Sequence, residues 1–251
     1  MTLKATWLVL LLSLSLNALA DGRAVTACGL DRFQFTLIPK KDVEEQMREF
    51  QPLADLLVEG LGVPVDILPA SSYASVIDAM TTGAADMAVM GPAAYLLAVQ
   101  QEPGLSPFAT LAMESGRFTT EGSSYYSMLL VGADSEFDDT LDLRGASVAL
   151  GDPASTSGNL VPRALFPEAA GEGFDGFFGA LTYTGGHDRA LDALIAGRVD
   201  GAFVSSSRVD EYVQRGKVSV DGLRVIWRSG PLHYDPFVFS ARLCEPVKAR
   251  V

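Results

Sequence analysis

Short apolar runs alternate with amphipathic stretches along most of the chain, and this alternation predicts an α/β fold. The apolar runs are bounded by Gly, Pro or Asp and have the length of buried strands. After the first run, Asp42 and Glu45 have the pattern of a helix cap, and Pro52 is expected to kink or divide the helix that follows. The expected strands, joined by helices in parallel sheets, are 33–38, 65–68, 87–90, 126–131, 147–150, 201–204 and 223–227.

An internal repeat without gaps predicts that these elements form two lobes of similar build. In each copy a helix leads through a glycine turn into a strand. Tyr73 and His187 each lie five residues before the first aligned Asp, at the expected N-termini of matching helices, so we expect them to face one cleft from opposite lobes. Chance similarity between Ala-rich segments is the alternative. The repeat aligns Asp78, Ala79, Gly83, Asp86 and Ala88 with Asp192, Ala193, Gly197, Asp200 and Ala202.

The N-terminal residues have the pattern of a secretory signal peptide. Lys4 precedes an apolar run over residues 5–19, and small residues at 18–20 form a cleavage signal. The run is shorter than the roughly 20 residues of a membrane-spanning helix. We expect export and cleavage after residue 20, with a lipoprotein box ending at Cys28 as the alternative. The expected domains are a signal peptide (1–20), a first lobe (21–115), a second lobe (116–230) and a return to the first lobe (231–251).

The net charge of the chain limits the classes of partner that it is expected to bind. Without residues 1–20 the chain has 31 acidic and 18 basic residues, a net charge of −13. Nucleic acid is therefore not an expected partner, because it is bound mainly by Lys and Arg. A small anion remains compatible with this charge where backbone N–H groups and hydroxyls gather locally.

The two cysteines of the chain, Cys28 and Cys244, are expected to form a disulfide near the chain ends, since an oxidising compartment would let them pair. A metal site is the alternative. The only histidines are His187 and His233, and no Cys-x-x-Cys spacing occurs, so we expect no metal.

The strongest chemical signal is the segment 152–158, Asp-Pro-Ala-Ser-Thr-Ser-Gly, between an expected strand and an expected helix. Hydroxyls beside the unpaired N–H groups of a helix start suit a tetrahedral oxyanion. An ordinary Ser/Thr cap is the alternative, but three successive hydroxyl residues exceed what a cap needs. His187, preceded by Gly185 and Gly186 at another helix start, is expected to contact the same ligand.

Three motifs together resemble the phosphate/phosphite/phosphonate-binding family of ABC transporters, and the resemblance runs from about Phe33 to the end of the chain. The motifs are Asp-Pro-x-Ser-Thr-Ser-Gly at 152–158, Gly-His-Asp at 186–188, and Gly-x-x-Asp at 83–86 followed by Gly-Pro at 91–92. The resemblance implies a type II periplasmic binding protein, with two α/β lobes joined by a hinge that close on a ligand like a Venus flytrap. It also implies a monomer without a cofactor, located in the periplasm, that delivers its ligand to an ABC permease of the inner membrane.

Carried over residue by residue, the resemblance places ligand contacts in both lobes. Ser155, Thr156, Ser157 and His187 would bind phosphorus oxygens from one lobe, with Tyr73 and Tyr95 lining the other. Family members normally continue into a C-terminal helical segment, so this chain, which stops at Val251, is expected to be truncated. Residues 205–207 offer hydroxyls where aminophosphonate binders have acidic residues, and Asp235 is the remaining carboxylate candidate.

We therefore expect a binding protein, not an enzyme, for phosphite or a small alkylphosphonate, with phosphate as a further candidate. One alternative is a sensory module for another oxyanion, such as arsenite, that signals to a sensor kinase. Another is a secreted serine hydrolase with Ser157 as nucleophile, His187 as base and Asp200 or Asp235 as the orienting acid. No Gly-x-Ser-x-Gly elbow surrounds Ser157, which disfavours the hydrolase.

Overall fold

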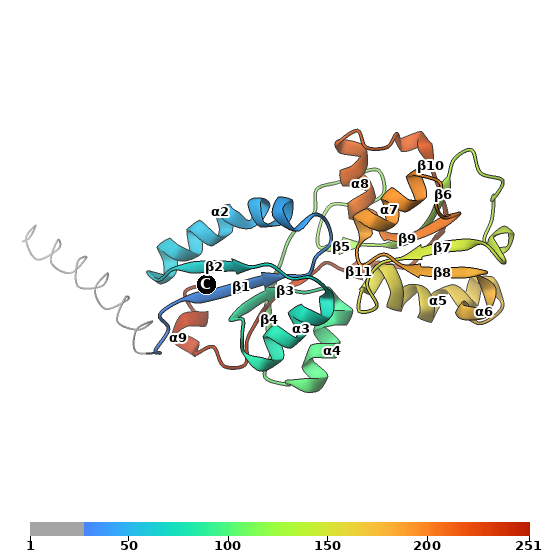
Figure 1. Cartoon of the computed structure of the whole chain (residues 1–251). Helices are drawn as coiled ribbons and strands as arrows, with labels where there is room; N and C mark the ends of the chain where they lie inside the picture. Colours follow the sequence, from blue (N-terminus) through green and yellow to red (C-terminus); the bar gives the residue numbers. More distant parts are fainter. Residues whose placement is uncertain (1–27) are drawn as a thin grey trace, which may run out of the picture.

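Two α/β lobes lie side by side in the computed structural model, which describes residues 28–251 (Figure 1). Lobe 1 is built on a five-stranded sheet with the order β2-β1-β3-β12-β4. Helices α2 (Val43–Leu61) and α9 (Glu245–Lys248) pack on one face, and α3 (Tyr73–Thr82) and α4 (Pro92–Gln101) on the other. The strands are β1 (Phe33–Leu37), β2 (Val65–Leu68), β3 (Met87–Val89), β4 (Ser106–Thr110) and β12 (Pro236–Phe239).

Lobe 2 repeats this plan on a sheet with the order β10-β6-β9-β7-β8. Helices α5 (Val161–Ala170) and α6 (Phe174–Phe177) cover one face, and α7 (His187–Ile195) and α8 (Ser206–Gln214) the other. Short helical turns are η1 (Leu141–Leu143), η2 (Thr156–Leu160) and η3 (Val220–Gly222). The strands are β6 (Ser127–Gly132), β7 (Ser147–Leu150), β8 (Ala180–Tyr183), β9 (Gly201–Ser205) and β10 (Leu223–Arg228).

The chain passes between the lobes along a two-stranded antiparallel sheet, formed by β5 (Ser124–Tyr125) and β11 (Leu232–His233) (Figure 1). After β11 the chain returns to lobe 1 as β12. This strand lies antiparallel between β3 and β4. Two narrow crossings of this kind are typical of a hinge, because few backbone torsions need to change when the lobes move.

The internal repeat is confirmed as a repeated structure. In lobe 1, Gly83 ends α3 in the left-handed region with φ 73°, and the Asp86 carboxylate accepts a hydrogen bond from Gln34 N–H at 2.8 Å. In lobe 2, Gly197 (φ 64°) follows α7, and the Asp200 carboxylate accepts from Ser147 N–H at 2.7 Å. Each Asp thereby ties the start of its strand to the neighbouring parallel strand.

Two expectations about the elements need correction. The sheets are mixed, because β12 in lobe 1 and β6 and β10 in lobe 2 run antiparallel to their neighbours. Pro52 does not divide α2, which continues as one helix from Val43 to Leu61 with Asp42 as its cap. The expected signal peptide lies outside the described residues. Among those described, no helix has both the length and the apolar character needed to span a membrane.

An aromatic cluster fixes the helix that carries the 152–158 segment. The Phe166 ring of α5 is fully buried and packs against Phe177, Phe178 and Phe203 with ring centroids 5.1 to 5.5 Å apart. Removing such a ring typically costs about 3–5 kcal/mol of stability. The start of α5, and with it the preceding loop, is therefore held firmly against the lobe 2 sheet.

A disulfide joins Cys28 to Cys244, whose Cα atoms are 6.3 Å apart. It ties the start of the described chain to the residue that precedes α9. Both cysteines pack against the lobe 1 core that contains Phe33 and Val247.

Candidate binding site between the lobes

A small cavity lies between the two lobes, where the strands of both sheets reach their carboxyl ends. This is the position at which open α/β sheets bind ligands. Lobe 1, lobe 2 and the hinge all contribute side chains. The lining residues are Ile38, Lys40, Tyr73, Gly91, Tyr125, Ser155, Thr156, Ser157, His187, Ser205, Ser207, Tyr234 and Asp235.

Helix starts converge on this cavity from several directions. The first residues of α3 and α7, Tyr73 and His187, line it, as do Gly91 and Ser205, which immediately precede α4 and α8. Helix N-termini carry unpaired N–H groups and a partial positive charge. Their convergence favours an anionic ligand even though the chain as a whole is acidic.

The three hydroxyls of the 152–158 segment are buried and have different partners. Ser155 accepts a hydrogen bond from Gly158 N–H at 3.1 Å and caps the turn η2, so the ordinary-cap interpretation holds for this residue. Thr156 accepts from Ala93 N–H of lobe 1 at 2.9 Å. Ser157 Oγ lies 3.3 Å from His187 Nε2. Accepting a bond occupies only a lone pair, so the hydroxyl protons of Ser155 and Thr156 remain available for a ligand oxygen, whereas the direction of the Ser157–His187 bond depends on the imidazole tautomer.

His187 is a neutral hydrogen-bonding group in this site. Burial, together with the positive charges of Arg208 and Lys40, lowers the pKa of its imidazole to about 3. Its Nδ1 atom is buried and has no hydrogen-bond partner among the described residues. Buried polar atoms nearly always have a partner, so this nitrogen indicates where a bound ligand completes the site.

Three tyrosines surround the cavity. Burial raises the pKa of the Tyr73 and Tyr125 phenols above the usual value, and the charge of Asp235 raises it further. Both phenols therefore stay protonated and can donate hydrogen bonds. Tyr125 of β5 meets the ring of Tyr234 edge to face with centroids 5.5 Å apart, and this pair forms the hinge side of the cavity.

Lys40 and Asp235 form a buried ion pair in the cavity wall. Their Nζ and Oδ2 atoms are 2.7 Å apart, and their side chains are 15% and 6% exposed. Lys40 Nζ also lies 3.3 Å from the Tyr234 hydroxyl. Burial by itself would lower the pKa of the Lys40 ammonium, but Asp235 and Tyr234 together hold it above its usual value. The pair therefore supplies one positive and one negative charge.

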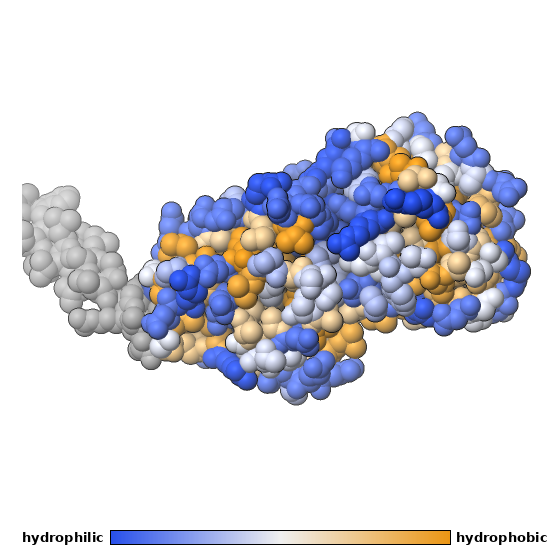
Figure 2. Space-filling model, viewed as in Figure 1, coloured by the Kyte–Doolittle hydropathy of each residue, from blue (hydrophilic) through white to orange (hydrophobic). Residues whose placement is uncertain are grey.

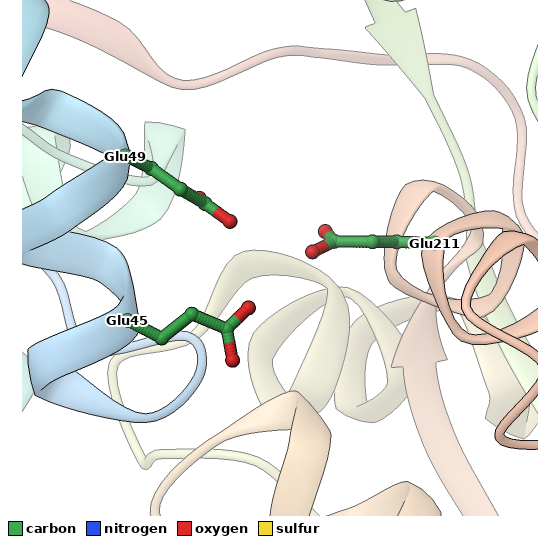
Figure 3. Close-up of side chains that lie close together, drawn as sticks. All are labelled: Glu45, Glu49 and Glu211. Carbon is green, nitrogen blue, oxygen red and sulfur yellow. The ribbon is translucent and has the colours of Figure 1, made fainter.

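A second set of ionisable side chains joins the lobes outside the cavity. The carboxylates of Glu45 and Glu49 on α2 and of Glu211 on α8 point toward one another, with one oxygen of each within 4.8 Å of the others (Figure 3). Lys41 and Arg215 form ion pairs with all three. Such an arrangement could hold a metal ion, but here Lys41 and Arg215 already pair with all three acids, and Arg208 also pairs with Glu211. Figure 2 shows hydrophilic surface over this junction between α2 and α8.

Most of the residues predicted from the sequence come together at the cavity. Tyr73, His187 and Asp235 line it with the three hydroxyl residues 155–157, and their contact with a ligand stays a prediction. The structure does not bring Tyr95 to the cavity. Its ring packs against the core between α3 and α4, and its hydroxyl donates to the Leu105 carbonyl at 3.5 Å.

The ligand contacts predicted from the sequence did not include Lys40, Tyr125 or Tyr234. Lys40 follows directly after the carboxyl end of β1, so the rule that places ligands beyond strand ends would have pointed to it. No sequence pattern indicated that Tyr234 would lie at the cavity. It reaches the cavity because β11 and β12 bring residue 234 back to the hinge.

The fold and the site define a two-lobed binding protein of the type II periplasmic kind, with its ligand position between the lobes. The chain belongs to the family described as ABC transporter, phosphonate, periplasmic substrate-binding protein, whose model matches residues 35–251.

Curated relatives and a solved structure agree with this family. The chain is 29% identical over 199 residues to the phosphate-import protein PhnD of Mycolicibacterium smegmatis, covering 76% of this chain and 61% of the relative. It is 26% identical over 221 residues to the phosphonates-binding periplasmic protein of Escherichia coli, covering 86% and 63%. The chain thus spans less than two thirds of the length of these relatives. A binding-protein component of an ABC phosphonate transporter from Pseudomonas aeruginosa has the same fold, with a TM-score of 0.77, 23% identity and coverage of 87% and 72%.

Proposed function

We propose that this chain is the solute-binding component of an ABC importer and that its ligand is phosphite or a small alkylphosphonate. One observation carries the proposal. The hydroxyls of Ser155, Thr156 and Ser157 and the imidazole of His187 meet Tyr73 of the opposite lobe around one small cavity at several helix starts. These neutral donors suit the oxygens of a tetrahedral anion.

The residues that line the cavity favour a tetrahedral ligand with one apolar substituent. Ile38 and the rings of the cavity tyrosines supply apolar surface beside the hydroxyls. A P–H or P–CH₃ group can rest on that surface, whereas a fourth phosphate oxygen would lose hydration there. The relatives are named for phosphate import and for phosphonate binding, so both ligand classes belong in the test.

The geometry gives little support to a hydrolase. Ser157 and His187 lie within hydrogen-bonding distance, but a serine hydrolase also needs an acid that orients the other imidazole nitrogen. Nδ1 of His187 has no such partner among residues 28–251. With its pKa lowered to about 3 by burial, this imidazole is also a weak base.

Family membership supports a periplasmic location and an inner-membrane ABC permease as the partner. The sensory alternative predicts the same ligand-binding domain, encoded by a gene that lies next to the gene for a sensor kinase. Neighbouring genes for a permease and an ATPase would support delivery instead, and the ligand experiment below is independent of that question.

A thermal-shift panel tests the ligand. It contains phosphite, methylphosphonate, 2-aminoethylphosphonate, hypophosphite, phosphate, sulfate and arsenite. A ligand at a hundredfold excess over its dissociation constant adds about 2.7 kcal/mol of stability, which raises the melting temperature by several degrees. We expect phosphite or methylphosphonate to give the largest shift. A panel in which only sulfate or arsenite responds would refute the proposal.

A further inference from the structure

The cavity contains no net formal charge to meet an anion. Of the residues that line it, Lys40 and Asp235 carry full charges, and they neutralise each other in the 2.7 Å ion pair. His187 is neutral because burial lowers its pKa to about 3. A phosphorus oxyanion with two negative charges would therefore enter without a matching cation and next to a carboxylate. A singly charged ion meets less repulsion.

One oxygen of Asp235 remains available toward the ligand space. Oδ2 is bound to Lys40, whereas Oδ1 receives no hydrogen bond from the described residues. Oδ1 lies beside Gly91, since a Cβ placed on this glycine would be 3.7 Å from Oδ1 and 3.2 Å from Thr156 Oγ1. The free oxygen is thus close to the hydroxyl of Thr156, which is one of the expected ligand contacts. A carboxylate oxygen there can only accept a hydrogen bond.

We propose that Asp235 is a specificity-determining residue that accepts the proton of a P–OH group, so that the site binds the singly protonated, monoanionic form of its ligand. This inference rests on the proposed function. The fully ionised form places an oxygen lone pair against Oδ1, and sulfur oxyanions do so at every working pH because they have no proton to donate. Asp235 thereby separates phosphorus oxyanions from sulfate and sulfonates of the same shape.

Three ionisable groups near Asp235, Lys40, Tyr73 and Tyr125, have pKa values that are shifted further from neutral pH. Lys40 lies on the loop after β1, Tyr73 on α3, Tyr125 on β5 and Tyr234 beside Asp235 itself. Although burial opposes it, the pKa of Lys40 is held above its usual value by Asp235, and burial raises the pKa values of Tyr73 and Tyr125. The change of ligand affinity with pH near neutrality therefore reports mainly the proton of the ligand.

Methylphosphonate and methanesulfonate form a matched pair for the test. Both are tetrahedral ions with one methyl group, but only methylphosphonate has an ionisable proton near neutral pH. Isothermal titration calorimetry of the wild-type protein from pH 6 to pH 9 measures both. We expect methylphosphonate affinity to fall about tenfold per pH unit above the second pKa of the ligand. Methanesulfonate should bind on the order of a hundredfold more weakly at pH 6, because a site built around a donated hydrogen bond rejects an analogue that lacks it.

The variant Asp235→Asn replaces the acceptor with an amide that can donate to an ionised oxygen. We expect it to reduce the ratio of the affinities for methylphosphonate and methanesulfonate about tenfold or more. The affinity for methylphosphonate should also depend less on pH than in the wild type. Because this change leaves Lys40 without its carboxylate, the double variant Lys40→Met, Asp235→Asn serves as a charge-neutral companion.

The outcomes separate this inference from the proposed function. Methylphosphonate or phosphite binding with an affinity that is constant or rises with pH would overturn the role of Asp235 and leave the proposed function standing. Equal wild-type affinity for methanesulfonate would do the same. If no phosphorus oxyanion binds at any pH, the proposed function fails, and this inference fails with it.

Discussion

The carboxylate of Asp152 in lobe 2 accepts a hydrogen bond from the backbone N–H of Tyr73, the first residue of α3 in lobe 1, at 3.2 Å. Asp152 also accepts from Ala154 N–H within its own loop at 2.8 Å. Thr156 makes the second contact of this kind with lobe 1, at Ala93 near the start of α4. The segment 152–158 of one lobe therefore contributes acceptors to the starts of two helices of the other.

Loss of the Asp152 contact should weaken binding without removing a ligand contact. The bond to Tyr73 exists only when the lobes are together, whereas the bond to Ala154 lies within lobe 2, so Asp152→Ala removes the contact of the closed state together with one local bond. We expect the affinity for methylphosphonate or phosphite to fall by about 1 kcal/mol, roughly fivefold, as measured by isothermal titration calorimetry.

Asp152→Asn is a partial control, because its one amide oxygen can accept from Tyr73 N–H or from Ala154 N–H but not from both, and it should retain more of the affinity than Asp152→Ala. Small-angle scattering should show a smaller ligand-induced decrease in the radius of gyration for Asp152→Ala than for the wild type at the same ligand concentration. Unchanged affinity in Asp152→Ala would show that this bond does not contribute to closure.

Ser157 and His187 should be the most sensitive single positions for ligand affinity. Ser157→Ala and His187→Ala each remove a group that can bond a charged oxygen, and we expect each to cost about 1.5–3 kcal/mol of binding free energy. Because the two side chains contact each other, the double variant should lose less than the sum.

Tyr95→Phe provides the control for that series. It removes a phenol that points to the Leu105 carbonyl rather than to the cavity, so ligand affinity should change little. Tyr73→Phe, by contrast, should weaken binding. Equal effects of the two tyrosine substitutions would contradict the placement of the site.

Most of the strands that sequence patterns predicted have buried residues, although β2 and β10, which were also predicted, are only partly buried. Strands β1, β3, β7 and β9 have buried apolar runs, and the expected ranges agree with them to within one residue at either end. The strands β4 and β8 were not expected. They lie at the edges of their sheets, and most of their side chains are exposed, so an apolar run was never required there.

At the site as well, local sequence patterns predicted some residues, whereas contacts between positions far apart in the sequence were not predicted. The hydroxyl segment and His187 follow strands directly, so their position at a helix start could be inferred from nearby residues. The partnership of Asp235 with Lys40 joins positions 195 residues apart in the sequence, and no local pattern predicts it. Tyr95 was expected to line the cavity from lobe 1, but α4 turns its ring toward the core.

The disulfide between Cys28 and Cys244 should contribute strongly to stability. It closes a loop with a sequence separation of 216, and the chain-entropy model gives about 5 kcal/mol for a loop of this length. Intact-mass analysis with and without reductant should show a difference of two hydrogens, and reduction should lower the melting temperature. The variant Cys28→Ser, Cys244→Ser is expected to melt at the temperature of the reduced protein. Free thiols in protein purified from the periplasm would refute the pairing.

His187 should make the protein less stable as the pH falls below 6.5. Its pKa is about 3 in the folded protein because burial disfavours the charged imidazole, against an ordinary value of 6.5 in the unfolded chain. Between these values the unfolded state binds a proton that the folded state does not. Stability is therefore lost as the pH decreases, by at most about 1.4 kcal/mol per pH unit. The variant His187→Gln keeps a polar side chain but cannot titrate. Denaturant unfolding from pH 7 to pH 4 should show a shallower decline for this variant, since the acid sensitivity that remains comes from carboxylates shared by both proteins. Parallel curves would mean that His187 is protonated in the folded state and exclude its assignment as a neutral ligand-binding group.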